Sequence, residues 1–140
     1  MKYHETKITV RFNEIDAYRI AWHGHYVAWM EIGRNALAGQ FELDALQLVS
    51  AGYLGPVVAL ELKFLRPARF NDEVTIQTTL RRSETATLEF ITTIVGPDGK
   101  KCATGTTTHA LIDLDGGLQF QLPPLIAGRI DRLLAWLELP

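Results

Sequence analysis

The sequence has very little cysteine. Cys102 is the only cysteine in 140 residues, so no disulfide can form within the chain, and we expect a protein of a reducing, cytoplasmic compartment. No apolar run approaches the roughly 20 residues that a membrane-spanning helix needs. Residues 1–7 also lack the apolar core of a signal peptide. We therefore expect no membrane partner.

A strong charge of either sign is also missing. The chain has 14 Lys and Arg against 16 Asp and Glu, a formal net charge of -2 at pH 7, and no long basic block. Nucleic-acid binding normally requires a basic surface, so we expect no nucleic-acid partner. Repeats and linker-like segments are absent too. Hydrophobic residues make up 47% of the sequence, which predicts one globular domain over residues 1–140.

The N-terminal part predicts a strand, an irregular connection and a long helix. Apolar and polar residues alternate over residues 6–13, which is the period of a half-buried strand. A connection over 16–24 follows, and the helix is expected from about residue 23 or 24 to residue 38, with Gly39 as its C-cap. Because this helix is apolar on most sides, we expect it to be buried.

The remainder is rich in strands. Alternating residues predict strands over 57–65, 73–80, 87–95 and 101–114. In the first of these, Leu60, Leu62 and Phe64 share one face, and residues 96–100 carry a strong hairpin signal. A short helix is expected within 41–53 and an amphipathic helix over 126–137. Short hairpins favour an antiparallel sheet. The whole pattern predicts an α+β fold in which an antiparallel sheet wraps round one long central helix.

Two stretches resemble the signature of the 4-hydroxybenzoyl-CoA thioesterase family of hotdog proteins. The first is Val10-Arg11-Phe12-x-Glu14-x-Asp16, followed by His23-x-x-Tyr26 and Glu31-x-x-Arg34, and the second runs from Leu62 to Glu73. With the later strands, the resemblance covers roughly residues 6–114. It implies a hotdog fold, hydrolysis of an acyl-CoA thioester without a cofactor, and a homodimer whose sheets join, often paired into a homotetramer.

The resemblance places the catalytic carboxylate at Asp16. Taken alone, this residue reads as an ordinary turn or capping aspartate. Thioester hydrolysis needs a nucleophile at the acyl carbon, and a carboxylate either attacks that carbon directly or deprotonates the attacking water. The sequence does not choose between these two roles.

His23 stands at the entry to the predicted helix. A backbone N–H at a helix N-terminus carries partial positive charge and can stabilise the oxyanion formed at the thioester carbonyl. The imidazole orients the substrate carbonyl, protonates the leaving thiolate, or is structural. We expect His25 to be structural, Tyr26 to belong to the core, and Glu31 and Arg34 to form a structural ion pair.

Four arginines are candidates for binding the phosphates of coenzyme A: Arg66, Arg69, Arg81 and Arg82. Some members of the family have basic phosphate ligands near residues 84–86, which this chain lacks. An acyl-carrier protein is therefore an alternative donor of the acyl group. The spacing of the His, Asp and Glu residues in the first stretch matches no standard zinc pattern, and we expect no metal.

Two departures from the family pattern keep other functions open. Phe12 stands where relatives frequently have tyrosine, and Arg19 stands where they often have glycine. A non-catalytic hotdog protein that binds acyl-CoA is the main alternative. A hotdog hydratase is disfavoured, because its Asp-x-Asn-Pro-x-His pattern is replaced by Ala17-Tyr18-Arg19-Ile20 after Asp16.

Overall fold

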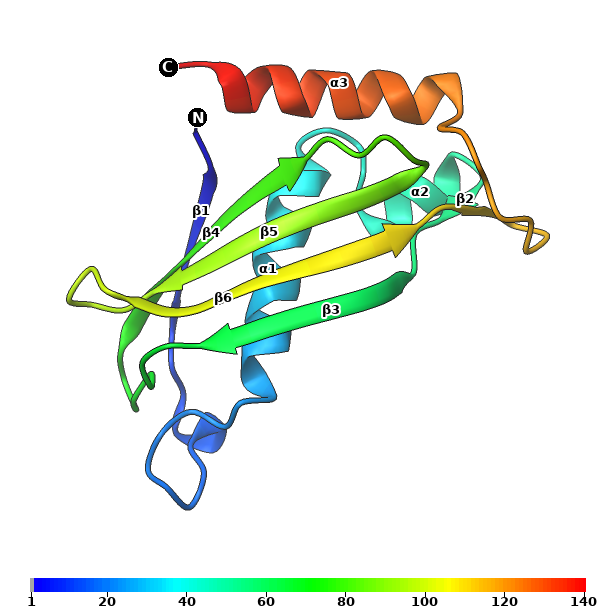
Figure 1. The fold of residues 1–140 in the computed structure, drawn as a ribbon. Coiled ribbons are helices and arrows are strands. Elements are labelled where there is room, and N and C mark those ends of the chain that lie inside the picture. Colours follow the sequence, from blue (N-terminus) through cyan, green and yellow to red (C-terminus); the bar gives the residue numbers. More distant parts are fainter. Residues whose placement is uncertain (1) are drawn as a thin grey trace.

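The computed structural model describes residues 2–140 as an antiparallel sheet wrapped round a helix (Figure 1). The sheet has the strand order β1-β4-β5-β6-β3, and every neighbouring pair is antiparallel. Helix α1 lies across one face of this sheet. The α+β hotdog fold expected from the sequence is therefore confirmed. The bounds of these elements are β1 His4–Thr9, α1 His25–Gly39, β3 Val57–Phe64, β4 Glu73–Arg81, β5 Thr87–Val95 and β6 Lys101–Ala110.

Smaller elements close the two ends of the sheet. A 3-10 turn, η1 (Phe12–Glu14), precedes the loop that leads to α1. The short helix α2 (Ala45–Ser50) leads into β2 (Tyr53–Leu54), which pairs with β7 (Ile112–Asp113). Helix α3 (Pro124–Glu138) crosses one end of the sheet (Figure 1). Lys2 N donates a hydrogen bond to Leu137 O at 2.9 Å, so the two ends of the chain lie together.

The core forms because the strands alternate and α1 presents a buried stripe to them. In β4 and β5 every second residue is buried against the helix side of the sheet. The helix contributes Trp29, Met30 and Leu37 to this core. A Cβ at Gly33 would lie 2.5 Å from Ile76 Cγ2, so glycine lets α1 approach β4 closely. Cys102 is also buried, and burial raises the pKa of its thiol.

Several expected boundaries differ from the structure. The first strand ends at Thr9 rather than residue 13, because Val10 N donates to Asp72 O outside the ladder and η1 follows. Gly39 is the last helical residue of α1 rather than its C-cap, which is Gln40. The expected strand over 101–114 is divided into β6 and β7. The hairpin over 96–100 is confirmed, and Gly99 supplies the positive φ of 79°.

The edge strand β3 is less buried than its pattern suggests. Leu60 and Phe64 are 44% and 48% exposed, although Leu62 packs partly into the core. Strand β3 pairs only with β6 in the sheet, so its other edge has no partner in the described chain, residues 2–140. A long apolar edge strand of this kind is rare on a monomer unless something covers it.

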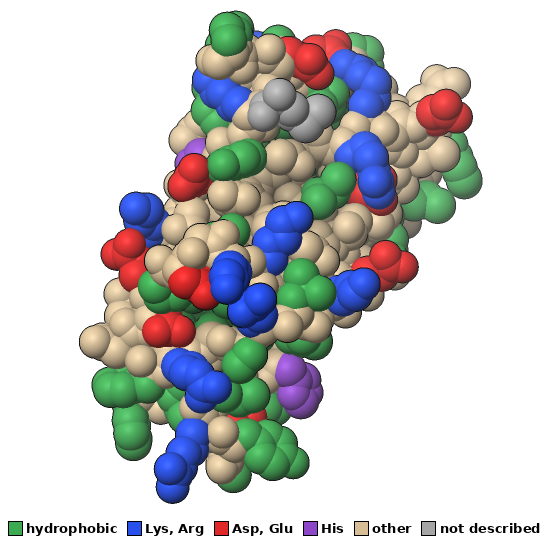
Figure 2. All heavy atoms as spheres, turned by 60° about the vertical axis from the view of Figure 1, so that its left-hand side comes forward, with side chains coloured by type: hydrophobic (Ala, Val, Ile, Leu, Met, Phe, Trp, Pro, Cys, Tyr) green, Lys and Arg blue, Asp and Glu red, His purple; other side chains and the backbone are tan. Residues whose placement is uncertain are grey.

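The outer surface carries charges of both signs. On the face shown in Figure 2, Lys and Arg side chains are interspersed with Asp and Glu, and hydrophobic side chains gather at the lower end. That end holds the loop between η1 and α1 in Figure 1. Within residues 2–140, no helix is both long and apolar enough to cross a membrane.

Candidate active site

A cavity of about 440 Å³ opens beside the N-terminal end of α1. It brings together three of the expected catalytic and substrate-binding residues, Asp16, His23 and Arg66. Asp16 and His23 come from the loop before α1, with His23 two residues before the first helical residue, and Arg66 comes from the segment after β3. The other lining residues are mainly apolar or aromatic: Tyr18, Ile20, Ala21, Trp22, Tyr26, Phe64, Leu65 and Pro67.

The loop that carries Asp16 is held by the buried carboxylate of Glu14. Its Oε1 accepts from Arg11 N at 2.8 Å, and its Oε2 accepts from Trp29 Nε1 at 2.9 Å. Burial alone would raise the pKa of Glu14, but the hydrogen bonds from Arg11 and Trp29 outweigh it and lower this pKa below the ordinary value. The loop is then closed by Trp22 N donating to Glu14 O and Ala21 N donating to Ala68 O.

Asp16 lies at the start of a tight turn and is half-buried. Its Oδ1 accepts a hydrogen bond from Tyr18 N at 2.8 Å, and its backbone O accepts from Arg19 N at 2.9 Å. The carboxylate therefore does the turn-stabilising work of an ordinary aspartate. Its Oδ2, however, accepts no hydrogen bond from any described residue (2–140), so one oxygen of this cavity-lining carboxylate stays available.

The turn after Asp16 uses a left-handed residue. Arg19 has φ of 64°, a conformation that glycine adopts without cost and that costs other residues about 1 kcal/mol or more. Arg19 is exposed and is not among the residues that line the cavity.

The start of α1 offers two unused backbone donors. Helix bonding begins with His25 N donating to Trp22 O, whereas the N–H groups of His23 and Gly24 find no acceptor among residues 2–140. A Cβ at Gly24 would lie 2.1 Å from Trp22 Cζ3, so only glycine lets the indole ring lie against this end of the helix. The two N–H groups directly precede the first helical residue, His25, and so lie beside the positive end of the helix dipole.

Aromatic rings form one wall of the cavity. Phe64 packs edge-on against Tyr26 and His23, with ring centroids 5.1 Å and 6.3 Å away, and Trp22 packs against His23 at 5.1 Å. Tyr26 is buried, as expected, and its hydroxyl accepts from Ala68 N at 3.1 Å. This bond fixes the segment after β3, which carries Arg66 and Pro67, beside the helix.

The four arginines proposed for coenzyme A do not lie together. Arg66 lines the cavity. Arg69 is exposed in the following turn, where its N–H donates to Asp72 Oδ2. Arg81 and Arg82 lie at the far end of β4, and both line a separate groove beside α3.

Each of these two distant guanidinium groups already has an acidic partner. Arg81 pairs with Glu89, and Arg82 Nη2 lies 3.2 Å from Asp131 Oδ1. The chain therefore brings Arg66, and not Arg81 or Arg82, to Asp16.

The remaining polar residues of the first motif are distributed along α1. Glu31 and Arg34 form the expected ion pair through two hydrogen bonds. His25 packs against Trp22 rather than pairing with a carboxylate. In the described part of the chain, no three His, Cys, Asp or Glu side chains are grouped as metal ligands.

Two polar residues were not expected from the sequence. Glu14 belongs to the first motif, but nothing in the sequence indicates that its carboxylate is buried. Its hydrogen-bond partner Trp29 is 15 residues away. His109 is buried inside β6 and bonds Thr107, Gly55 and Arg34. A histidine at an inward-facing position of an otherwise Thr- and Ala-rich strand is the only signal that marked it.

Comparisons with known proteins agree with this architecture. The thioesterase-like superfamily profile matches residues 10–137. The chain is 29% identical over 134 residues to "Putative esterase sll0410" of Synechocystis sp., which covers 94% of this chain and 81% of that protein. It is 26% identical to "Putative acyl-CoA thioesterase YneP" of Bacillus subtilis, over 76% of this chain and 78% of that one. A DHNA-CoA thioesterase from Staphylococcus aureus superposes with a TM-score of 0.85 at 20% identity, covering 96% and 93% of the two chains.

Proposed function

Because the chain belongs to the thioesterase-like superfamily, we propose that it hydrolyses an acyl-CoA to a free carboxylic acid and coenzyme A, with Asp16 as the catalytic carboxylate. The observation that carries this proposal is the cavity in which the available oxygen of Asp16 shares one space with the start of α1. The narrower assignment to the 4-hydroxybenzoyl-CoA thioesterase family is part of the same proposal.

The chemistry needs a nucleophile and a place for negative charge. Asp16 either attacks the acyl carbon, giving an anhydride that water then hydrolyses, or removes a proton from the attacking water. In both routes the C–S bond breaks and the coenzyme A thiolate leaves and takes up a proton. The oxyanion formed on the way would be stabilised by the unused N–H groups of His23 and Gly24.

Arg66 is our candidate for the phosphate-bearing end of coenzyme A. It lies at the rim of the Asp16 cavity, and Arg69 follows three residues later in an exposed turn. Cationic side chains at this end suit a nucleotide phosphate. An acyl-carrier protein would present its acyl group without these phosphates, so the dependence of KM on Arg66 separates the two donors.

We propose that the chain acts as a homodimer, or as a homotetramer built from such dimers. The support is the unpaired apolar edge of β3, which Leu60 and Phe64 leave exposed. A two-fold axis at this edge would pair β3 with its copy in antiparallel fashion and join the two sheets. Phe64 and Leu65 line the Asp16 cavity, so the joined edge would border the active site.

Release of free thiol from a panel of acyl-CoA thioesters tests the proposal. We expect release that is proportional to enzyme and that is lost in Asp16→Asn, for at least one acyl group in an aliphatic and aromatic series. If every thioester binds but none releases thiol, the chain is an acyl-CoA-binding protein instead, which is the alternative that the sequence left open.

A further inference from the structure

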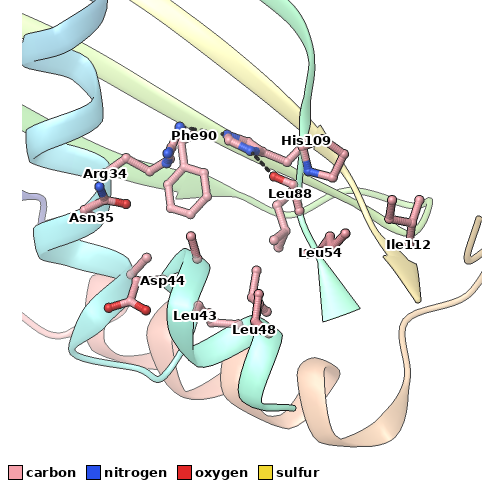
Figure 3. A pocket seen from close by; sticks show the side chains of 15 residues that line it. Arg34, Asn35, Leu43, Asp44, Leu48, Leu54, Leu88, Phe90, His109 and Ile112 are labelled. Atoms are coloured by element: carbon pink, nitrogen blue, oxygen red, sulfur yellow. Dashed lines mark hydrogen bonds between the residues drawn. The ribbon is translucent and has the colours of Figure 1, made fainter. Parts of the chain in front are cut away.

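A second cavity, of about 350 Å³, lies at the other end of β3 from the Asp16 cavity. It is enclosed by the C-terminal half of α1, the helix α2, the residues before β3, and the ends of β5 and β6 (Figure 3). Apolar side chains make up most of its walls, four of them leucines, and Phe90 lies on one side. This size and lining are typical of a small-molecule site, which needs a few fixed polar groups to select its ligand.

Arg34 supplies the polar group. Its side chain is only 15% exposed and reaches towards Phe90 and His109 in Figure 3. Glu31 accepts one hydrogen bond from each terminal nitrogen, and His109 Nε2 lies 3.5 Å from Nη1. A guanidinium has five N–H donors, so two of them have no acceptor among residues 2–140.

His109 acts as a fixed acceptor behind Arg34. Its Nδ1 lies 2.9 Å from Gly55 O, and because a carbonyl only accepts, Nδ1 must carry the proton. Nε2 then carries a lone pair. It lies 3.5 Å from Arg34 Nη1 and 3.0 Å from Thr107 Oγ1. The histidine is buried and neutral in this arrangement, so it orients the guanidinium without adding charge.

Two carboxylates and one guanidinium carry the charges at the cavity, which leaves a small negative excess. The positive charge of Arg34 is balanced by Glu31, and the one other ionisable group in the lining besides His109 is Asp44, whose Oδ1 caps α2 through Gln47 N. A carboxylate ligand would meet two carboxylates and one guanidinium, which is unfavourable. An uncharged ligand with an acceptor oxygen would use the free N–H groups without that repulsion.

We propose that this cavity binds an uncharged apolar group that carries a hydroxyl or carbonyl oxygen, and that Arg34, positioned by Glu31 and His109, donates to that oxygen. The ligand is either the far end of the acyl group of the thioester or a separate small molecule. In the antiparallel β3 pairing proposed above, the start of one β3 faces the end of the other. The second cavity of one protomer would then lie towards the Asp16 cavity of its partner, which favours the acyl group.

Phenol and toluene are matched probes, because the hydroxyl of phenol takes the place of the methyl group of toluene. We would titrate each into the full-length protein and follow the backbone amide and Arg Nε–H resonances by NMR. We expect phenol to bind about fivefold more tightly than toluene, the factor that corresponds to one net hydrogen bond. In Arg34→Met the preference for phenol should be lost and should reverse in favour of toluene, since Met keeps the apolar stem but leaves the buried hydroxyl without a partner. Glu31 is exposed enough for water to solvate its unpaired charge.

A second variant keeps Arg34 and blocks the space. Val49 lines the cavity and is 43% exposed, so Val49→Trp should fill it without breaking α2 and should abolish binding of both probes. Leu46→Trp on the exposed side of the same helix is the control, because Leu46 is 80% exposed and outside the cavity. Equal binding of phenol and toluene to the natural protein overturns the proposal. The proposal is also overturned if Arg34→Met still prefers phenol, or if Val49→Trp still binds either probe.

Turnover measurements then decide whether the ligand is the acyl group of the substrate or a separate molecule. Only this step rests on the proposed function. The substrates are 3-(4-hydroxyphenyl)propanoyl-CoA and 3-phenylpropanoyl-CoA. If the acyl group occupies the cavity, Arg34→Met lowers kcat/KM for the hydroxylated thioester about fivefold relative to the other. If a separate molecule occupies it, both variants hydrolyse the two thioesters at the ratio of the unmodified protein, although Arg34→Met has lost its preference for phenol and Val49→Trp no longer binds either probe. A chain that hydrolyses no thioester of the aliphatic and aromatic series would overturn the proposed function and leave the phenol result standing.

Discussion

The indole of Trp29 donates a hydrogen bond to the buried carboxylate of Glu14, with 2.9 Å between Nε1 and Oε2. This contact joins the core of α1 to the loop that carries Asp16. Glu14 is only 3% exposed, so its charge is stabilised by Trp29 and Arg11 rather than by water. The position of the candidate catalytic carboxylate therefore depends on a carboxylate two residues earlier.

Glu14→Gln should lower the free energy of unfolding by about 2 kcal/mol at pH 7, the usual range for hydrogen bonds to a buried charged group. The folded state lowers the pKa of Glu14, so its contribution is complete above the ordinary value of 4.5 and is lost as the pH falls through the lowered pKa. Denaturant titrations at pH 7 and well below pH 4.5 should thus show a difference that disappears in acid. Glu5→Gln, an exposed position on β1, is the control and should be neutral at both pH values.

Asp16→Asn should lower kcat by at least about two orders of magnitude, since an amide has little basicity or nucleophilicity. The fold and substrate binding should persist, because the amide oxygen can still accept from Tyr18 N. Asp16→Ala removes that bond as well and should also cost about 1 kcal/mol of stability. If Asp16 serves only the turn, Ala lowers the melting temperature while turnover per folded molecule stays at the natural value.

Arg66→Ala should raise KM for an acyl-CoA about tenfold with little change in kcat, because a phosphate contact acts equally in the ground and transition states. The Arg81→Ala and Arg82→Ala double variant should change KM less, since both side chains are engaged by Glu89 and Asp131 in another groove. Steady-state kinetics on one thioester compares them directly. A larger effect in the double variant would move the nucleotide site to the α3 end of β4.

Two helical glycines should respond to alanine in opposite directions. In Gly33→Ala the new Cβ would meet Ile76 and Thr78 Oγ1 at 2.5 and 2.6 Å, which should destabilise the protein by about 1–3 kcal/mol. In Gly128→Ala on α3 the Cβ meets nothing within 4 Å, and the higher helix propensity of Ala should stabilise it by about 0.5–1 kcal/mol. Chemical denaturation of both variants measures the difference. A neutral Gly33→Ala would show that α1 does not require this close approach.

The sequence was sufficient for the sheet and for α1, because alternation over β4 and β5 and the apolar stripe on α1 are local patterns. Prediction from the sequence failed where a residue's contact partner lies far away along the chain. Nothing near Glu14 reveals that Trp29 will bury and bond its carboxylate, so the first strand was extended through a segment that turns away from the sheet. The same limit hid the contact between His109 and Arg34, which are 75 residues apart.

The alternation in β3 shows a different limit. Leu60 and Phe64 form the expected apolar row, but periodicity cannot say whether a row is covered within the chain or by another molecule. The homodimer, the roles of Asp16 and His23, and the coenzyme A site at Arg66 therefore stay proposals, for which the structure supplies the geometry.

Leu60→Lys should convert the proposed dimer into a monomer, because a lysine at an unpaired sheet edge opposes strand pairing. Sedimentation velocity at micromolar concentration gives the oligomeric state of this variant and of Leu46→Lys, an exposed control on α2. If Leu60→Lys loses both dimerisation and turnover, this would support an active site that borders the β3 edge. A natural protein that sediments as a fully active monomer would contradict the assembly proposed here.

Because Cys102 is buried, the reaction of its thiol with a reagent in solution would report unfolding of the chain. A thiol that is enclosed in the core and whose pKa is raised by burial reacts slowly with aromatic disulfide reagents, because the thiolate is the reactive form. A colorimetric assay of coenzyme A release should therefore run over a flat protein background. A slow additional rise in absorbance, up to one equivalent of thiol per chain, would measure the fraction of molecules that have unfolded during the experiment.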